Sequence, residues 1–225
     1  MKKELFKTLV SDLKADVFFS DYKYIRSDNT FWYNSGADSV FVDLFHWRDY
    51  WDDNCVIRPV YCRHFDILSK WFEKFSVMSI KDQRYYPHIM RYNDTAGQDP
   101  EFEFKYDFSD YEEKFQQFSN ILKDNITRLV NTYSTVNDFY TKYVLRRTFG
   151  DQELPDVGAD WIFFYLTSGF LLDKENYPAL KKKVLERAEW MVNREEPNIV
   201  NYYDRMDEII SYMENNVKFD ECVKA

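Results

Sequence analysis

The residues whose types and spacing could do chemistry gather between positions 43 and 54. This stretch combines an imidazole, a guanidinium, aromatic rings and carboxylates. Rings offer stacking faces and carboxylates accept hydroxyl or cationic donors, so a sugar, an aromatic amine or a peptide would fit. Trp, Tyr and Arg are also the residues that dominate protein–protein interfaces. The candidate ligand or partner site consists of Asp43, His46, Trp47, Arg48, Asp49, Tyr50, Trp51, Asp52 and Asp53.

Two other interpretations of this stretch stay open. A glycoside hydrolase needs two carboxylates about 5–9 Å apart, one of them with a raised pKa in an apolar surrounding. Asp43, flanked by Phe41 and Phe45, is a candidate for the raised one, but the sequence does not identify its partner. Alternatively, Trp47 and Trp51 plug the ends of the core while the aspartates face water. We therefore assign no catalytic residue and favour a protein that is not an enzyme.

Motifs for cofactors and metals are missing from the sequence. There is no G-x-G, no G-x-x-x-x-G-K-S/T loop and no G-x-S-x-G turn. Cys55 and Cys62 lack the short spacing of a zinc site, and if 56–61 is a strand they lie roughly 20 Å apart. Cys62 and His64 could share a strand face, but such a pair is common without catalysis. We expect no cofactor, no metal and free thiols.

Charge and hydropathy limit the partners that we expect. Lys+Arg is 30 and Asp+Glu is 39, a formal net charge of -9, which argues against a nucleic-acid binder. The longest uncharged apolar stretch runs from Trp161 to Leu172. A membrane-spanning helix needs about 20 such residues, so we expect a buried helix there. The charged N-terminal residues do not resemble a secretory signal, and we expect a cytoplasmic protein with no membrane partner.

The elements that must position the candidate site follow from the hydrophobic period. Residues 2–15 repeat apolar side chains at helical spacing, and 22–26, 30–34 and 40–47 are short β-like runs separated by turns. In the third run, Val40, Val42 and Leu44 alternate with Phe41 and Phe45, which predicts an inner strand covered on both faces. Residues 56–61 predict a fourth strand, in which Pro59 favours an edge or a bulge. Phe102 to Phe108 alternate rings with charges, which predicts another strand.

Helical periods dominate the rest of the chain. We predict helices over 65–75, 111–133, 136–149, 161–172, 178–193 and from Pro197 to Val217. Strands followed by a run of helices indicate an α+β fold: an N-terminal helix and an antiparallel sheet of four to six strands, then a mostly helical C-terminal half. We favour one domain over residues 1–225, with a possible subdivision at 108/109, where the apolar period changes.

Short segments of the N-terminal part resemble a group of known proteins. They are Lys2-x-x-Leu5-Phe6, Asn29-Thr30-Phe31-Trp32-Tyr33 and Val40-Phe41-Val42-Asp43-Leu44. Together they are similar to the start of certain uncharacterised bacterial domain-of-unknown-function proteins, over about the first 75 residues. The resemblance implies an N-terminal helix leading into an antiparallel sheet and later helices. Some of those families are suspected immunity or defence components.

Our leading functional hypothesis is a non-catalytic binding protein that recognises a protein partner, of an immunity or defence type. The alternative is a binder of small carbohydrate-like ligands, or a hydrolase, that uses residues 43–54. A homodimer through the seams of helices 111–133 and 199–217 is a third possibility.

Overall fold

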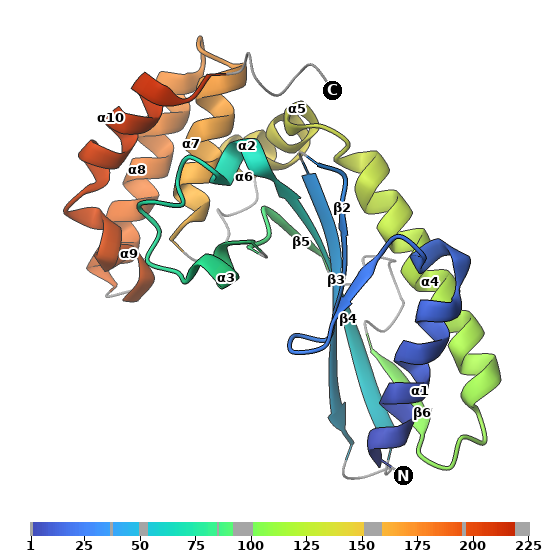
Figure 1. Cartoon of the computed structure of the whole chain (residues 1–225). Coiled ribbons are helices and arrows are strands. Elements are labelled where there is room, and N and C mark those ends of the chain that lie inside the picture. Colours follow the sequence, from blue (N-terminus) through green and yellow to red (C-terminus); the bar gives the residue numbers. More distant parts are fainter. Residues whose placement is uncertain are drawn as a thin grey trace. The chain divides into compact units, whose positions relative to one another are not determined.

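The fold is α+β, as the hydrophobic periods predict (Figure 1). We describe it from a computed structural model of residues 2–36, 38–49, 54–84, 86–91, 101–150, 159–194 and 197–218. An N-terminal helix leads into an antiparallel sheet, and the C-terminal half is mostly helical.

The chain forms two compact units, each built from two separate segments. Unit 1 comprises Met1–His64 and Ile89–Thr132, and unit 2 comprises Phe65–His88 and Tyr133–Ala225. The change of apolar period at 108/109 falls inside unit 1, because the helix that follows it packs on the sheet of that unit.

Unit 1 contains a six-stranded sheet with the order β1-β2-β3-β4-β5, in which β6 also pairs with β4. Its first three strands form the predicted meander. Thr30 pairs with Asp43 and Asn34 with Ser39 in the antiparallel ladder of β2 and β3. The strands are β1 (Lys23–Ile25), β2 (Thr30–Asn34), β3 (Asp38–Arg48), β4 (Asn54–Phe65), β5 (Ile89–Arg91) and β6 (Phe102–Lys105).

Pro59 explains how two short strands share one side of β4. Residues 54–57 of β4 pair with β6, and residues 61–63 pair with β5. Pro59, which has no N–H to donate, lies between these two ladders. The prediction of an edge strand is therefore wrong for β4 as a whole, because β3 pairs with its other side. Among the described residues, the two ladders on this side of β4 stop short of Pro59 from either direction.

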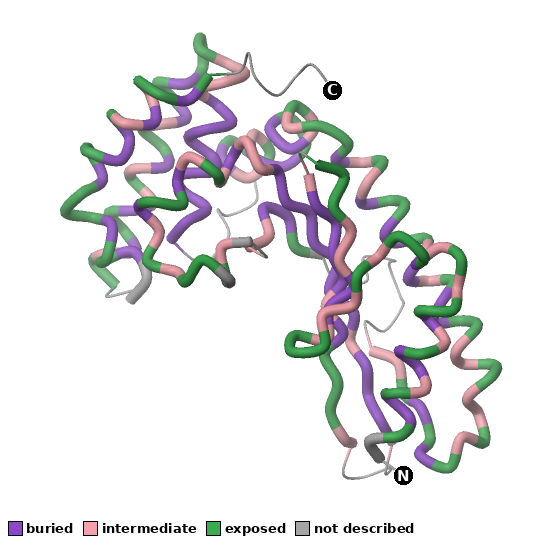
Figure 2. Tube along the Cα trace, in the orientation of Figure 1, coloured by how far each residue is buried: buried purple, intermediate pink, exposed green. Residues whose placement is uncertain are grey.

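Helices α1 (Lys2–Ala15) and α4 (Tyr111–Thr132) cover one face of this sheet (Figure 1). The Tyr111 hydroxyl donates to Asp12 at 2.6 Å, which ties the two helices together. Phe118 of α4 packs edge-on against Phe102 and Phe104 of β6. Much of β3 and β4 is buried, as the purple trace in Figure 2 shows. Successive side chains of a strand therefore face either the helices or the opposite side of the sheet. This alternation decides which candidate site residues can lie together.

Unit 2 is built around α7 (Trp161–Leu172), whose residues from Trp161 to Gly169 are all buried. The predicted central apolar helix is thus confirmed. Among the described residues, no helix combines the length and apolar character needed to cross a membrane. The other helices of unit 2 are α2 (Asp66–Ser69), α3 (Ile80–Arg84), α5 (Val136–Phe139), the π-helix η2 (Tyr140–Val144), α6 (Leu145–Phe149), α8 (Tyr177–Asn193), α9 (Pro197–Tyr203) and α10 (Met206–Asn216).

Three predicted helices are shorter or more broken than their periods indicate. The helix expected over 65–75 ends at Ser69, and the following turns use bonds such as Phe72 N–H to Ser69 C=O. The aromatic side chains of this segment pack inside unit 2 although the segment is not helical. A helix is not strongly favoured here, because aromatic residues have modest helix propensity. The segment 136–149 contains the π-helix, and the last predicted helix is divided into α9 and α10.

Candidate functional site

The predicted site residues occupy the end of β3 and the start of its hairpin with β4. Asp43, His46, Trp47 and Arg48 belong to β3, and the Asp49 N–H donates to the Asn54 carbonyl at 2.9 Å, which closes the hairpin. The remaining members, Tyr50, Trp51, Asp52 and Asp53, lie outside the described residues.

Strand alternation divides the described members between the two faces of the sheet. His46 lies on the helix-covered face, where its ring stacks on Phe6 of α1 with centroids 3.9 Å apart. Asp43 and Trp47 lie on the opposite face, because neighbouring residues of a strand point to opposite sides. A constellation that uses Asp43 and His46 together on one substrate is therefore not formed.

Two aromatic side chains at the end of β3 are exposed to solvent. Phe45 is 56% exposed and Trp47 is 39% exposed, and both lie on the face that α1 and α4 do not cover. The Arg58 guanidinium of β4 stands over the Trp47 ring, 5.1 Å from its centroid. Arg58 also pairs with Glu101. We call Phe45, Trp47 and Arg58 the hairpin aromatic surface.

Asp43 is held within the sheet rather than presented to solvent. The Thr30 hydroxyl, directly across the β2–β3 ladder, donates to its Oδ1 at 2.5 Å. Burial raises the pKa of Asp43, the Thr30 hydrogen bond opposes this rise, and the charge of Asp28 adds to it. A raised carboxyl pKa is what the hydrolase hypothesis expected at this position, but a paired carboxyl inside a ladder is also an ordinary structural feature.

The raised pKa of Asp43 makes a prediction about stability. An acid whose pKa is higher in the folded than in the unfolded chain stabilises the fold below its unfolded pKa of about 3.9. That contribution is lost as the pH rises through the folded pKa. Asp43→Asn keeps the acceptor for Thr30 but cannot ionise. We expect the variant to gain stability relative to the natural protein between pH 4 and pH 7, measured by urea unfolding.

Glu112→Gln provides the control, because Glu112 is an exposed carboxylate on α4 of the same unit. It corrects the comparison for the loss of one negative charge from the chain. If the stability of both variants, relative to the natural protein, changed equally with pH, the assignment of a buried carboxyl at Asp43 would be contradicted.

The cysteine and histidine pair of β4 is not arranged for catalysis. Cys62 and His64 are both buried. Burial raises the pKa of the Cys62 thiol well above its usual range, and the charge of Asp43 adds to this. A nucleophilic cysteine needs the opposite shift, so the sequence interpretation of this pair as core residues is favoured. Cys55 and Cys62 are free thiols, and Cys222 lies outside the described residues.

A pocket of about 450 Å³ in unit 1 was not predicted from the sequence. It opens between the segment 18–22, β2 and α4. Its buried members Val40, Arg63 and Ile126 form the floor. The Arg63 guanidinium, 6% exposed, pairs with the Asp38 carboxylate at 3.0 Å. A charged residue inside the apolar run of β4 was the signal that could have indicated this pocket.

Aromatic rings form the walls of this pocket, which we call the tyrosine pocket. The rings of Tyr22 and Tyr33 lie 5.4 Å apart, and Phe18 stacks on Tyr22 with centroids 6.1 Å apart. The exposed rim is polar and is formed by Asp21, Ser35, Thr127 and Asn131. The tyrosine pocket thus combines ring faces, a buried ion pair and a hydrogen-bonding rim.

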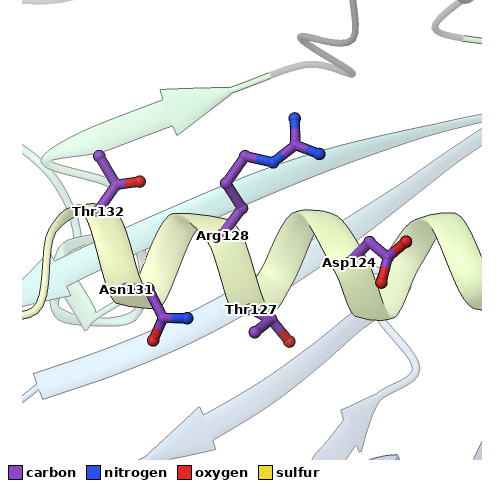
Figure 3. A pocket seen from close by; sticks show the side chains of 5 residues that line it. All are labelled: Asp124, Thr127, Arg128, Asn131 and Thr132. Carbon is purple, nitrogen blue, oxygen red and sulfur yellow. The ribbon is translucent and has the colours of Figure 1, made fainter.

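A second, shallower depression lies along α4, and Figure 3 shows the side chains that line it. Arg128 and Asn131 project from opposite sides of the helix in this view. Thr127 and Asn131 line both this depression and the tyrosine pocket. The depression is open to solvent and polar, and we assign no ligand to it.

Comparison with known proteins does not add to this picture. No family model, no curated protein and no solved structure matches the chain.

Proposed function

We propose that this protein is a non-catalytic binding protein that recognises a protein partner through the hairpin aromatic surface. The observation that carries the proposal is the exposure of Phe45 and Trp47, two large aromatic side chains on the same face of one strand. Soluble proteins cover most large apolar side chains, and neighbouring exposed ones mark contact surfaces.

The chemistry of the surface indicates what the partner presents. Trp47 and Arg58 are residue types that contribute strongly to interfaces when both become desolvated. The net charge of -9 favours a partner with basic residues around an apolar depression, because complementary charge accelerates association. An immunity or defence component that neutralises a basic protein has this character, and we propose a bacterial setting for it.

We also propose that the protein acts in the cytoplasm. Cys55 and Cys62 are buried free thiols. Free cysteines are usual in reducing compartments, whereas secreted proteins more often pair them.

The proposal predicts a large loss of partner affinity when the surface is made polar. The double variant Phe45→Ser and Trp47→Ala removes both exposed rings, and we expect the affinity for the partner to fall by about 100-fold or more. The measurement has two stages. Immobilised natural and variant proteins first capture partners from cells that naturally produce the chain. Biolayer interferometry then gives the two dissociation constants with the purified partner.

Val17→Ser serves as the matched control, because Val17 is an 85% exposed apolar residue of the same unit away from the hairpin. It should leave partner affinity unchanged. If no stoichiometric protein distinguishes the natural chain from the double variant, the proposed function is wrong.

Self-association is a separate outcome of the same measurements. The apolar residues predicted for a dimer seam, such as Leu122 in α4 and Met213 in α10, are buried within their units. A homodimer would therefore have to use another surface, such as the hairpin aromatic surface. Light scattering at micromolar concentration distinguishes a monomer from such a dimer.

A further inference from the structure

We propose that the tyrosine pocket is a binding site for a small, neutral, planar ring compound that carries a carbonyl group. This site is distinct from the hairpin aromatic surface, and the inference goes beyond the proposed function. Three features of the pocket support it: its size and ring geometry, the uncommitted hydroxyls of its walls, and the charge balance at its floor.

Size and ring geometry favour a planar ligand. A volume of about 450 Å³ lies within the range of roughly 300–1,000 Å³ that is typical of small-molecule sites. Phe18, Tyr22 and Tyr33 already form a series of ring contacts with centroids 6.1 and 5.4 Å apart. A further planar ring can extend this series through offset or edge contacts.

The tyrosine hydroxyls favour a ligand with an acceptor. Within the part of the chain that the structure describes, the hydroxyls of Tyr22 and Tyr33 have no hydrogen-bond partner. Burial raises the pKa of Tyr22 to about 12, the neighbouring Tyr33 adds to this rise, and the Arg63 guanidinium opposes it. Tyr22 is therefore protonated at neutral pH and can donate a hydrogen bond to a carbonyl oxygen.

Charge balance favours a neutral ligand over an anion. A lone buried guanidinium would attract a carboxylate, but Arg63 is already neutralised by Asp38 at 3.0 Å. Asp21 at the exposed rim adds a negative charge, and the whole chain carries a net charge of -9. These negative charges would repel an anionic ligand, and no cation would offset that repulsion. A neutral amide or lactam would not be repelled.

The experiment uses the full chain and a panel of monocyclic and bicyclic aromatic carboxamides, each paired with the matching carboxylate. Binding is measured by ligand-observed NMR and confirmed by titration calorimetry. For ligands of this size we expect the best carboxamide to bind with a Kd of about 1 mM or tighter. We expect its carboxylate to bind at least 10-fold more weakly.

Variants locate the binding in the tyrosine pocket. Thr127→Trp places a bulky ring at the exposed rim and should abolish binding, while Gln116→Trp, an exposed position on α4 outside the pocket, should not. Tyr33→Phe removes one hydroxyl and should weaken binding about 3- to 10-fold. Tyr24→Phe is its control, because Tyr24 bonds to Asn29 and does not line the pocket. Circular dichroism verifies that each variant is folded.

Three results would overturn the inference: no carboxamide of the panel binds, a carboxylate binds as tightly as its carboxamide, or folded Thr127→Trp still binds. The double variant Phe45→Ser and Trp47→Ala should bind the carboxamide unchanged. Failure of this inference is therefore distinguishable from failure of the proposed function.

Discussion

Replacing Tyr202 with alanine is expected to lower the free energy of unfolding by about 4–6 kcal/mol. The ring is 1% exposed and packs between Phe72 and Phe163, with centroids 5.6 and 5.4 Å away. Its hydroxyl accepts from the Val77 N–H at 2.9 Å and donates to Asp160 Oδ1 at 2.7 Å. The substitution therefore creates a cavity and also removes two hydrogen bonds from unit 2.

Tyr202→Phe separates the ring from the hydroxyl. It keeps the packing but leaves the buried Asp160 without its tyrosine donor, and burial already raises the pKa of that carboxyl. We expect a loss of about 1–3 kcal/mol for the hydroxyl alone. Urea unfolding followed by circular dichroism and tryptophan fluorescence gives both values.

Tyr203→Ala is the matched control, because the adjacent tyrosine is 40% exposed. We expect it to change stability by no more than about 0.5 kcal/mol. If Tyr202→Ala and Tyr203→Ala shifted the urea midpoint equally, the side of α9 that packs against the rest of unit 2 would differ from the one in the structure.

Elements with a strong period and clear ends could be predicted from the sequence. The Trp161–Leu172 helix was found because every face is apolar and charged residues flank it, and the structure has it with these bounds. The meander strand Thr30–Asn34 was found because turn residues bracket a β-favouring run. Both depend on local signals, which a single sequence contains in full.

The pairing of β4 could not be predicted, because it depends on strands far along the chain. Residues 61–63 pair with β5 and residues 54–57 with β6, and nothing near Pro59 specifies either partner. Likewise, the Arg63–Asp38 ion pair joins residues on two strands, and the tyrosine pocket also requires α4. Sequence proximity favoured residues 43–54 as a site, whereas the tyrosine pocket gathers residues from four separate segments.

The aromatic composition has a mostly structural explanation. Rings make up 20% of the chain, and many of the largest fully buried side chains are Phe or Tyr. Aromatic residues thus fill much of the core in both units. Phe45 and Trp47 are exceptions to this use, as are Phe149, Trp190 and Tyr203, and Phe45 and Trp47 share one face of a single strand.

Gly169 lies where α7 packs tightly against α8. A Cβ atom placed on this residue would lie 2.2 Å from Leu180 Cδ2 and 3.5 Å from Tyr177 Cδ2. Leu180 is completely buried, so its side chain has little room to move away. The glycine therefore allows the two helices to pack closely, at the cost of its own low helix propensity.

Gly169→Val is expected to destabilise the protein by about 2–3 kcal/mol, because the added side chain overpacks the α7–α8 contact. Leu180→Ala alone also destabilises, since it leaves a cavity in the same place. In the double variant the valine occupies part of that cavity, so the two losses should not add. Urea unfolding of the four proteins should give a favourable coupling of about 1 kcal/mol or more. Strictly additive losses would show that Gly169 and Leu180 do not contact each other in the folded protein.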